Sequence, residues 1–141
     1  MKSNNSELLQ SIDNQSPNKE ALYVDGTEVG YAMLERYSEP FNYYYLESLD
    51  ISPEFQGQGL GNKLLEQVNQ RLEAEQTPAI VLNFVAQMNL QKTPAIRKLY
   101  ENNAWEVLTP DSLWFGYIPK TLNREEYISK LKDLILARDN N

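Results

Sequence analysis

A glycine-rich hexapeptide, Gln56-Gly57-Gln58-Gly59-Leu60-Gly61, constrains this chain more than any other stretch. It separates an extended aromatic run at residues 43–51 from an apolar-periodic run at residues 60–72. A strand, a glycine loop and a helix in this order expose unpaired amides at the helix start, where the macrodipole favours an anion. Glycine suits such a loop because it adopts positive φ and has no Cβ to hold a phosphate away. The sequence therefore predicts a site for a phosphate-bearing ligand.

The spacing of the glycines excludes two common phosphate-binding motifs. A Walker A loop counted from Gly57 would need glycine at Asn62 and a hydroxyl at Leu64. A dinucleotide-binding fingerprint would need its third glycine at Asn62 or Leu64. The pattern that remains is Q-x-x-G-x-G.

Composition excludes several kinds of chemistry. The chain has 141 residues, which suits one domain, and it contains neither cysteine nor histidine. Disulfides, thiolate or imidazole metal sites and Ser-His-Asp catalysis are therefore excluded. The net charge of −7 argues against a nucleic-acid partner and mildly favours a cationic one. Since no apolar run reaches membrane length and no signal peptide opens the chain, we expect a cytoplasmic protein without a membrane partner.

Periodicity and turn residues predict an α/β (α+β) domain with a mixed sheet. A polar arm at 1–19 precedes the domain at 20–120, and a C-terminal helical segment follows at 121–141. Strands are expected at 21–24, 29–37, 43–51, 79–85, 105–108 and 113–118, and helices at 60–72, 93–102 and 123–138. Asp25-Gly26 predicts a hairpin turn.

The third predicted strand carries the aromatic run. Its period of two places Tyr43, Tyr45, Glu47, Leu49 and Ile51 on one face unless a bulge intervenes.

Three segments of the chain resemble the GNAT superfamily of acyl-CoA N-acyltransferases. The glycine loop resembles that family's [QR]-x-x-G-x-[GA] motif, and residues 46–55 resemble the strand that precedes it. Residues 96–105 resemble the later segment A-x-x-L-Y-E-x-x-G-F, although Ala104 and Trp105 stand where the family has Gly and Phe. The resemblance implies a mostly antiparallel twisted sheet with helices on both faces. Its central parallel strands, here 43–51 and 79–85, splay apart.

The resemblance also implies acetyl-CoA as co-substrate, with no metal. The pantetheine arm would insert between the splayed strands, and an amine would attack the acyl carbonyl without a covalent enzyme intermediate. Backbone groups of Leu49, Asp50 and Ile51 would bind the arm. Asn89 or Thr93 would fill the role of the family's asparagine. The residues whose amides would hold the pyrophosphate are Gln56, Gly57, Gln58, Gly59, Leu60, Gly61 and Asn62.

Two side chains are candidates for proton transfer. Tyr100 matches the family's tyrosine and is the candidate general acid, and the alternative is a tyrosine that only packs in the core. Glu47 is the candidate base, because a carboxylate buried on a central strand must be paired or used. The alternative for Glu47 is a structural ion pair with Arg97 or Lys63.

The acceptor is less clearly encoded than the donor. The acidity and Glu47 favour a small cationic amine, and a peptide acceptor remains open. The alternatives to an enzyme are a non-catalytic acyl-CoA sensor on the same fold and a nucleotide-binding protein with a variant phosphate loop. Because few residues precede the first strand, helix 123–138 is expected to help cover the acceptor site, within one subunit or across a homodimer.

Overall fold

The computed structural model describes residues 18–82, 93–111 and 113–139. The order of its elements is the predicted one, while residues 83–85 of the fourth strand and the predicted loop at 86–92 lie outside the described ranges. The strands are β1 (Asn18–Val24), β2 (Thr27–Tyr37), β3 (Tyr43–Ile51), β4 (Ala79–Leu82), β5 (Glu106–Val107) and β6 (Trp114–Tyr117). The helices are α2 (Leu60–Glu75), α4 (Thr93–Asn102), α5 (Arg124–Asp139) and the 3₁₀-helix η2 (Pro53–Phe55).

The strands form one six-stranded sheet in the order β1-β2-β3-β4-β6-β5. Every neighbouring pair is antiparallel except β3 and β4, which are parallel. The mixed, mostly antiparallel sheet is therefore confirmed. Asp25 and Gly26, with φ of 50° and 82°, make the predicted hairpin turn between β1 and β2.

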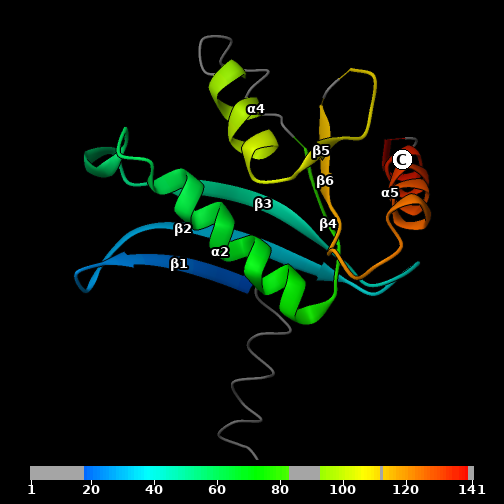
Figure 1. Ribbon diagram of the computed structural model, residues 1–141, viewed down its shortest axis with the longest axis horizontal. Helices are drawn as coiled ribbons and strands as arrows, with labels where there is room; N and C mark the ends of the chain where they lie inside the picture. The colour runs from blue at the N-terminus through cyan, green and yellow to red at the C-terminus, as the bar shows by residue number, and fades with distance from the viewer. Residues whose placement is uncertain (1–17, 83–92, 112, 140–141) are drawn as a thin grey trace, which may run out of the picture.

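Helices cover both faces of the sheet, as predicted. Figure 1 shows α2 lying across β1, β2 and β3, while α5 stands beside β6. The buried side chains divide into two clusters that follow these faces. The α2 cluster includes Tyr44, Leu46, Leu64, Leu65, Val68, Leu72, Tyr100, Trp105 and Phe115. The α5 cluster includes Tyr43, Ile80, Leu108, Trp114, Leu131, Leu134 and Ile135.

A β-bulge at Glu47 corrects the predicted facing of the third strand. Leu34 of β2 pairs with Leu46, but Met33 pairs with Ser48, so Glu47 is the extra residue. The insertion shifts the alternation by one residue. Leu49 and Ile51 consequently pack with the α2 cluster, whereas Tyr43 and Tyr45 pack with the α5 cluster. The sequence predicted one face for the five residues only in the absence of a bulge, and because the bulge is present they do not share a face.

The parallel strands β3 and β4 separate soon after they pair. Among the described residues, which end at Leu82 in β4, the ladder holds only Tyr44 opposite Ala79 and Tyr45 opposite Ile80. Beyond this point β3 continues with β2 as its partner, and β4 continues with β6. Figure 1 shows the two strands diverging. The splayed central pair is thus present, and the bulge at Glu47 comes two residues after the last paired residue of β3.

Asparagine side chains fasten the end of α4 to α2. Trp105 donates its indole N–H to Asn69 Oδ1 at 2.7 Å, and Asn69 Nδ2 donates to the Asn103 carbonyl at 2.7 Å. Asn103 Nδ2 donates in turn to Asn62 Oδ1 at 3.0 Å. These bonds satisfy an indole that is only 2% exposed, and they fix the helix that carries Tyr100 relative to the first turn of α2.

The C-terminal helix α5 is capped and docked by specific residues. Asn123 precedes the first residue of α5, and its Oδ1 accepts the Glu126 amide at 2.9 Å, as an N-cap does. Leu131 of α5 packs over Gly116 of β6, where a Cβ would come within 2.6 Å of Leu108 Cδ1 and 3.2 Å of Leu131 Cδ1. Since that glycine leaves room for the two leucines, α5 lies close to the sheet.

Candidate functional site

The glycine loop leads directly into α2. Gly57 and Gly59 have φ of 82° and 76°, and Gly59 is the N-cap of the helix. The backbone therefore requires glycine-like conformations at both positions. Gln56 donates its side-chain amide to the Ile51 carbonyl at 3.0 Å, which ties the loop to the end of β3.

The loop has the geometry of an anion site. Space around the positions where Gly57 and Gly59 would carry a Cβ is open to 4 Å, so a ligand could approach the backbone. No acidic residue lies in the first turn of α2, where one would compete with a bound anion. The side chain of Asn62 accepts a hydrogen bond from Asn103, and the predicted role needs only its backbone amide. These features fit a pyrophosphate held by amides at a helix start.

Glu47 occupies the bulge beside the point where β3 and β4 diverge, and its side chain is exposed rather than buried as predicted. Among the salt bridges of the described residues, none joins Glu47 to Lys63 or Arg97, and Arg97 pairs instead with Glu101 at 3.1 Å. Partial desolvation by the surrounding protein is the largest cause that raises the pKa of Glu47. The charge and hydrogen bonding of Glu35 raise it further.

Tyr100 lies on the other side of the sheet, in the α2 cluster. Its ring packs against Trp105 and Phe115 at centroid distances of 5.5 and 5.6 Å, and the side chain is 6% exposed. Burial raises the pKa of its hydroxyl above the ordinary value, so the group stays protonated at neutral pH. The packing fits a core tyrosine, and the protonated hydroxyl fits a proton donor.

Three of the predicted residues lie between the bulge of β3 and the glycine loop, and one falls outside the described ranges. Leu49, Asp50 and Ile51 follow the bulge on β3 and pair with Ala32, Tyr31 and Gly30 of β2. Asn89 lies outside the described residues, and Thr93 begins α4. Within the described ranges, no cluster of carboxylates could hold a metal ion, and no helix has the length and apolarity to cross a membrane.

Sequence reasoning missed the companions of Glu47. Glu35 of β2 pairs in register with Tyr45 of β3, and the Tyr37 hydroxyl donates to the Glu35 carboxylate. Arg138 at the end of α5 lies 4.8 Å from the Tyr45 ring centroid and 5.6 Å from that of Tyr37. The two carboxylates and the rings of Tyr37 and Tyr45 thus lie near one another on the α5 side of the sheet. Only the strand register and the docking of α5 reveal this group.

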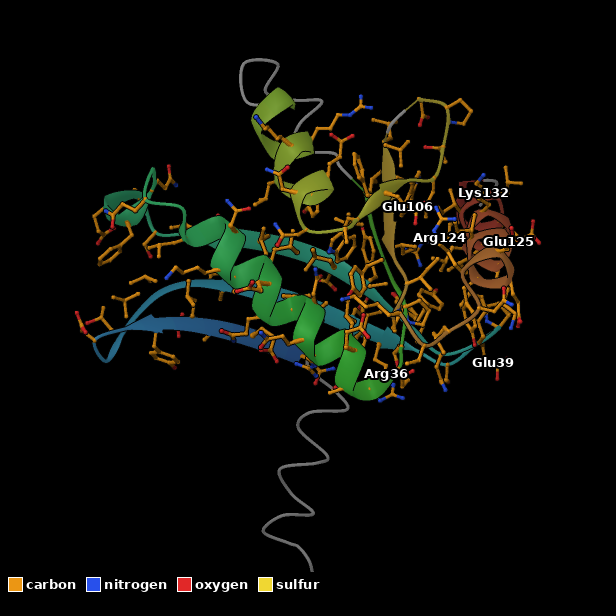
Figure 2. The ribbon with its side chains drawn as sticks, in the orientation of Figure 1. Arg36, Glu39, Glu106, Arg124, Glu125 and Lys132 are labelled. Carbon is orange, nitrogen blue, oxygen red and sulfur yellow. The ribbon has the colours of Figure 1, made fainter. Side chains whose placement is uncertain are left out.

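A cavity of about 390 Å³ lies elsewhere, between β5, β6 and the start of α5. Glu106 and Arg124 are among its lining residues and form an ion pair with an N–O distance of 2.5 Å. Figure 2 shows the two side chains next to each other. Its lining contains none of the predicted site residues.

Comparison with known families decides what this arrangement is. The model of the acetyltransferase (GNAT) domain matches residues 18–107, which is more than half of the chain. The chain is a GNAT acetyltransferase. Its splayed strands, glycine loop and Tyr100 segment all fall within the matched region. The protein is accordingly an acetyl-CoA-dependent N-acyltransferase, and acetyl-CoA is its co-substrate.

Solved structures share the fold at low sequence identity. A GNAT-family protein from Desulfovibrio desulfuricans superposes with a TM-score of 0.60 at 16% identity, covering 80% of this chain and 75% of that chain. The PaiA N-acetyltransferase of Thermoplasma acidophilum, in complex with coenzyme A, gives 0.57 at 17% identity, with coverages of 80% and 67%. The AtaT toxin, as a Y144F mutant bound to the C-terminus of its antitoxin AtaR, gives 0.57 at 16% identity, with coverages of 83% and 75%. No curated protein matches the sequence.

Proposed function

We propose that this GNAT protein transfers the acetyl group of acetyl-CoA to the primary amine of a small cationic molecule. The observation that carries the proposal is the pair of carboxylates, Glu35 and Glu47, beside the divergence of β3 and β4. The charge of Glu35 adds to the desolvation that raises the pKa of Glu47, and an ammonium ion would relieve the repulsion between the two carboxylates.

The proposed proton donor and the proposed acceptor site lie on opposite faces of the sheet. Tyr100 belongs to the α2 side, where the glycine loop also begins its helix. Glu35 and Tyr45 pair with each other on the α5 side, and Glu47 neighbours them at the bulge. An amine held there would face the divergence of the strands, where the resemblance places the thioester.

Two side chains, Glu47 and Tyr100, carry out the proton transfers of the proposed reaction. Glu47 takes a proton from the bound ammonium ion, which frees the nitrogen lone pair. The nitrogen forms a bond to the acetyl carbon and the carbon–sulfur bond breaks. The nitrogen releases its second proton to solvent, and Glu47 later releases the first proton to solvent as well. Tyr100 stabilises and protonates the departing sulfur, and its hydroxyl regains a proton from solvent. The products are the acetamide and free thiol.

A matched acceptor panel tests the proposal. Release of coenzyme A from acetyl-CoA is measured with butylamine, with glycine as an amine that also carries a carboxylate, with an amino sugar and with a short lysine peptide. We expect kcat/KM for butylamine to exceed that for glycine by about tenfold or more, because the two glutamates repel the carboxylate of glycine.

Two results would contradict the proposal. Faster turnover of the peptide than of every small amine would make the acceptor a protein. Binding of coenzyme A without transfer to any amine would favour the acyl-CoA sensor.

A further inference from the structure

The last turn of α5 places a fixed positive charge against the proposed acceptor site. Arg138 Nη1 donates to the Tyr43 hydroxyl at 3.3 Å, and the guanidinium lies over the Tyr37 and Tyr45 rings. Tyr37 and Tyr43 stack on each other at 5.0 Å with an interplanar angle of 12°. Three tyrosines from two strands therefore hold one arginine from a helix far away in the sequence.

The arginine is held by aromatic rings and a hydroxyl, while the glutamates stay near it. In the described part of the chain, no salt bridge joins Arg138 to Glu35 or Glu47. All three charges nevertheless affect the pKa of Tyr45. Burial is the largest cause that raises it, Arg138 lowers it, and Glu47 and Glu35 raise it further. The carboxylates form no ion pair with the arginine, although Glu35 accepts the Tyr37 hydroxyl, and they lie within the field of a permanent cation.

Docking of α5 fixes that cation in place. Leu131, Leu134 and Ile135 are buried against the sheet, so the helix that presents Arg138 cannot swing away freely. The aliphatic stem of an arginine loses much rotamer freedom when it is ordered on aromatic surfaces. A side chain that served only for solubility would not need this support.

We propose that Arg138 sets the charge selectivity of the acceptor site. With Glu35 and Glu47 it leaves the site a net charge of about −1, which matches one ammonium group and disfavours a second. The inference rests on the proposed function and adds to it the expected acceptor class, a monocationic amine. A dication would place its second ammonium in the field of the guanidinium.

The test compares two acceptors with the same four-carbon chain in variants of the full-length protein. The ratio of kcat/KM for 1,4-diaminobutane to that for butylamine is measured in the wild type, Arg138→Gln and Arg138→Met. Removal of the charge should raise the ratio about tenfold in both variants. Arg138→Met retains an aliphatic side chain against the rings, so it separates the loss of charge from the loss of packing.

Two matched variants serve as controls. Arg138→Lys keeps a positive charge and should stay within about twofold of the wild-type ratio. Lys132→Gln removes a charge from an exposed position of the same helix (Figure 2) and should also leave the ratio unchanged.

The possible failures are distinguishable. If the wild type acetylates butylamine but the ratio does not rise in Arg138→Gln or Arg138→Met, the role of Arg138 is wrong and the proposed function stands. An equal rise in Lys132→Gln also overturns it, because the effect would come from net charge alone. If the wild type acetylates no amine, both proposals fall together.

Discussion

Tyr100→Phe should lower kcat for acetyl transfer by about 10²-fold or more, in the range typical for loss of a general acid or of one oxyanion donor. The hydroxyl is the only group that the substitution removes. Because burial keeps it protonated, it can donate to the sulfur as the carbon–sulfur bond breaks. Phenylalanine should keep the contacts with Trp105 and Phe115, so steady-state kinetics would report on the hydroxyl alone.

Stability and coenzyme A affinity provide the control for that variant. The melting temperature and the Kd for coenzyme A should be nearly those of the wild type, because the ring fits the same space in the core. A kcat within about threefold of the wild-type value, with both controls unchanged, would assign Tyr100 to packing only and leave the proton donor to be found elsewhere.

Gly59→Asp should raise the Kd for coenzyme A at least about tenfold. A carboxylate at this N-cap would occupy the free amides at the start of α2 and repel the pyrophosphate. Charge-assisted hydrogen bonds contribute roughly 1.5–3 kcal/mol each, and 1.4 kcal/mol corresponds to a factor of ten, so the loss of one bond is sufficient. Isothermal titration with coenzyme A measures the effect directly.

Gly26→Asp is the matched control for the loop variant. Gly26 has φ of 82°, close to the 76° of Gly59, and a Cβ at either position would meet nothing within 4 Å. Both substitutions therefore impose similar backbone strain and add the same charge, but Gly26 belongs to the hairpin between β1 and β2. Equal weakening of coenzyme A binding in the two variants would show that the glycine loop is not the pyrophosphate site.

The conformation of the glycine loop and of the helix after it could be predicted from sequence because their signals are local. The strand, the glycine loop and the start of α2 follow one another without a gap, and their backbone conformations are dictated by residue type. The cap of α5 is equally local, since Asn123 and Glu126 are one helical turn apart. Positive φ at Gly57 and Gly59 confirms that those glycines serve the shape of the loop.

The proposed acceptor site depends on contacts between residues far apart in the sequence, which no local pattern encodes. The bulge at Glu47 falls between Leu46 and Ser48, with no glycine or proline to mark it. Glu47 was expected to be buried, but at the bulge its side chain is exposed. Its charged neighbour is Glu35, whereas the sequence suggested an ion pair with Lys63 or Arg97. Arg138 meets Tyr43 across 95 positions of the chain, a contact that requires α5 to dock first.

The pH dependence of kcat/KM for butylamine, in the wild type and in Glu35→Gln, tests most directly whether the two glutamates form the acceptor site. Glu47 must be ionised to accept a proton, so the rate should fall as pH drops through its raised pKa. Removing the negative charge of Glu35 lowers that pKa, and the acid limb should therefore move to lower pH even if kcat/KM itself decreases. An acid limb at the same pH in both proteins would contradict the account.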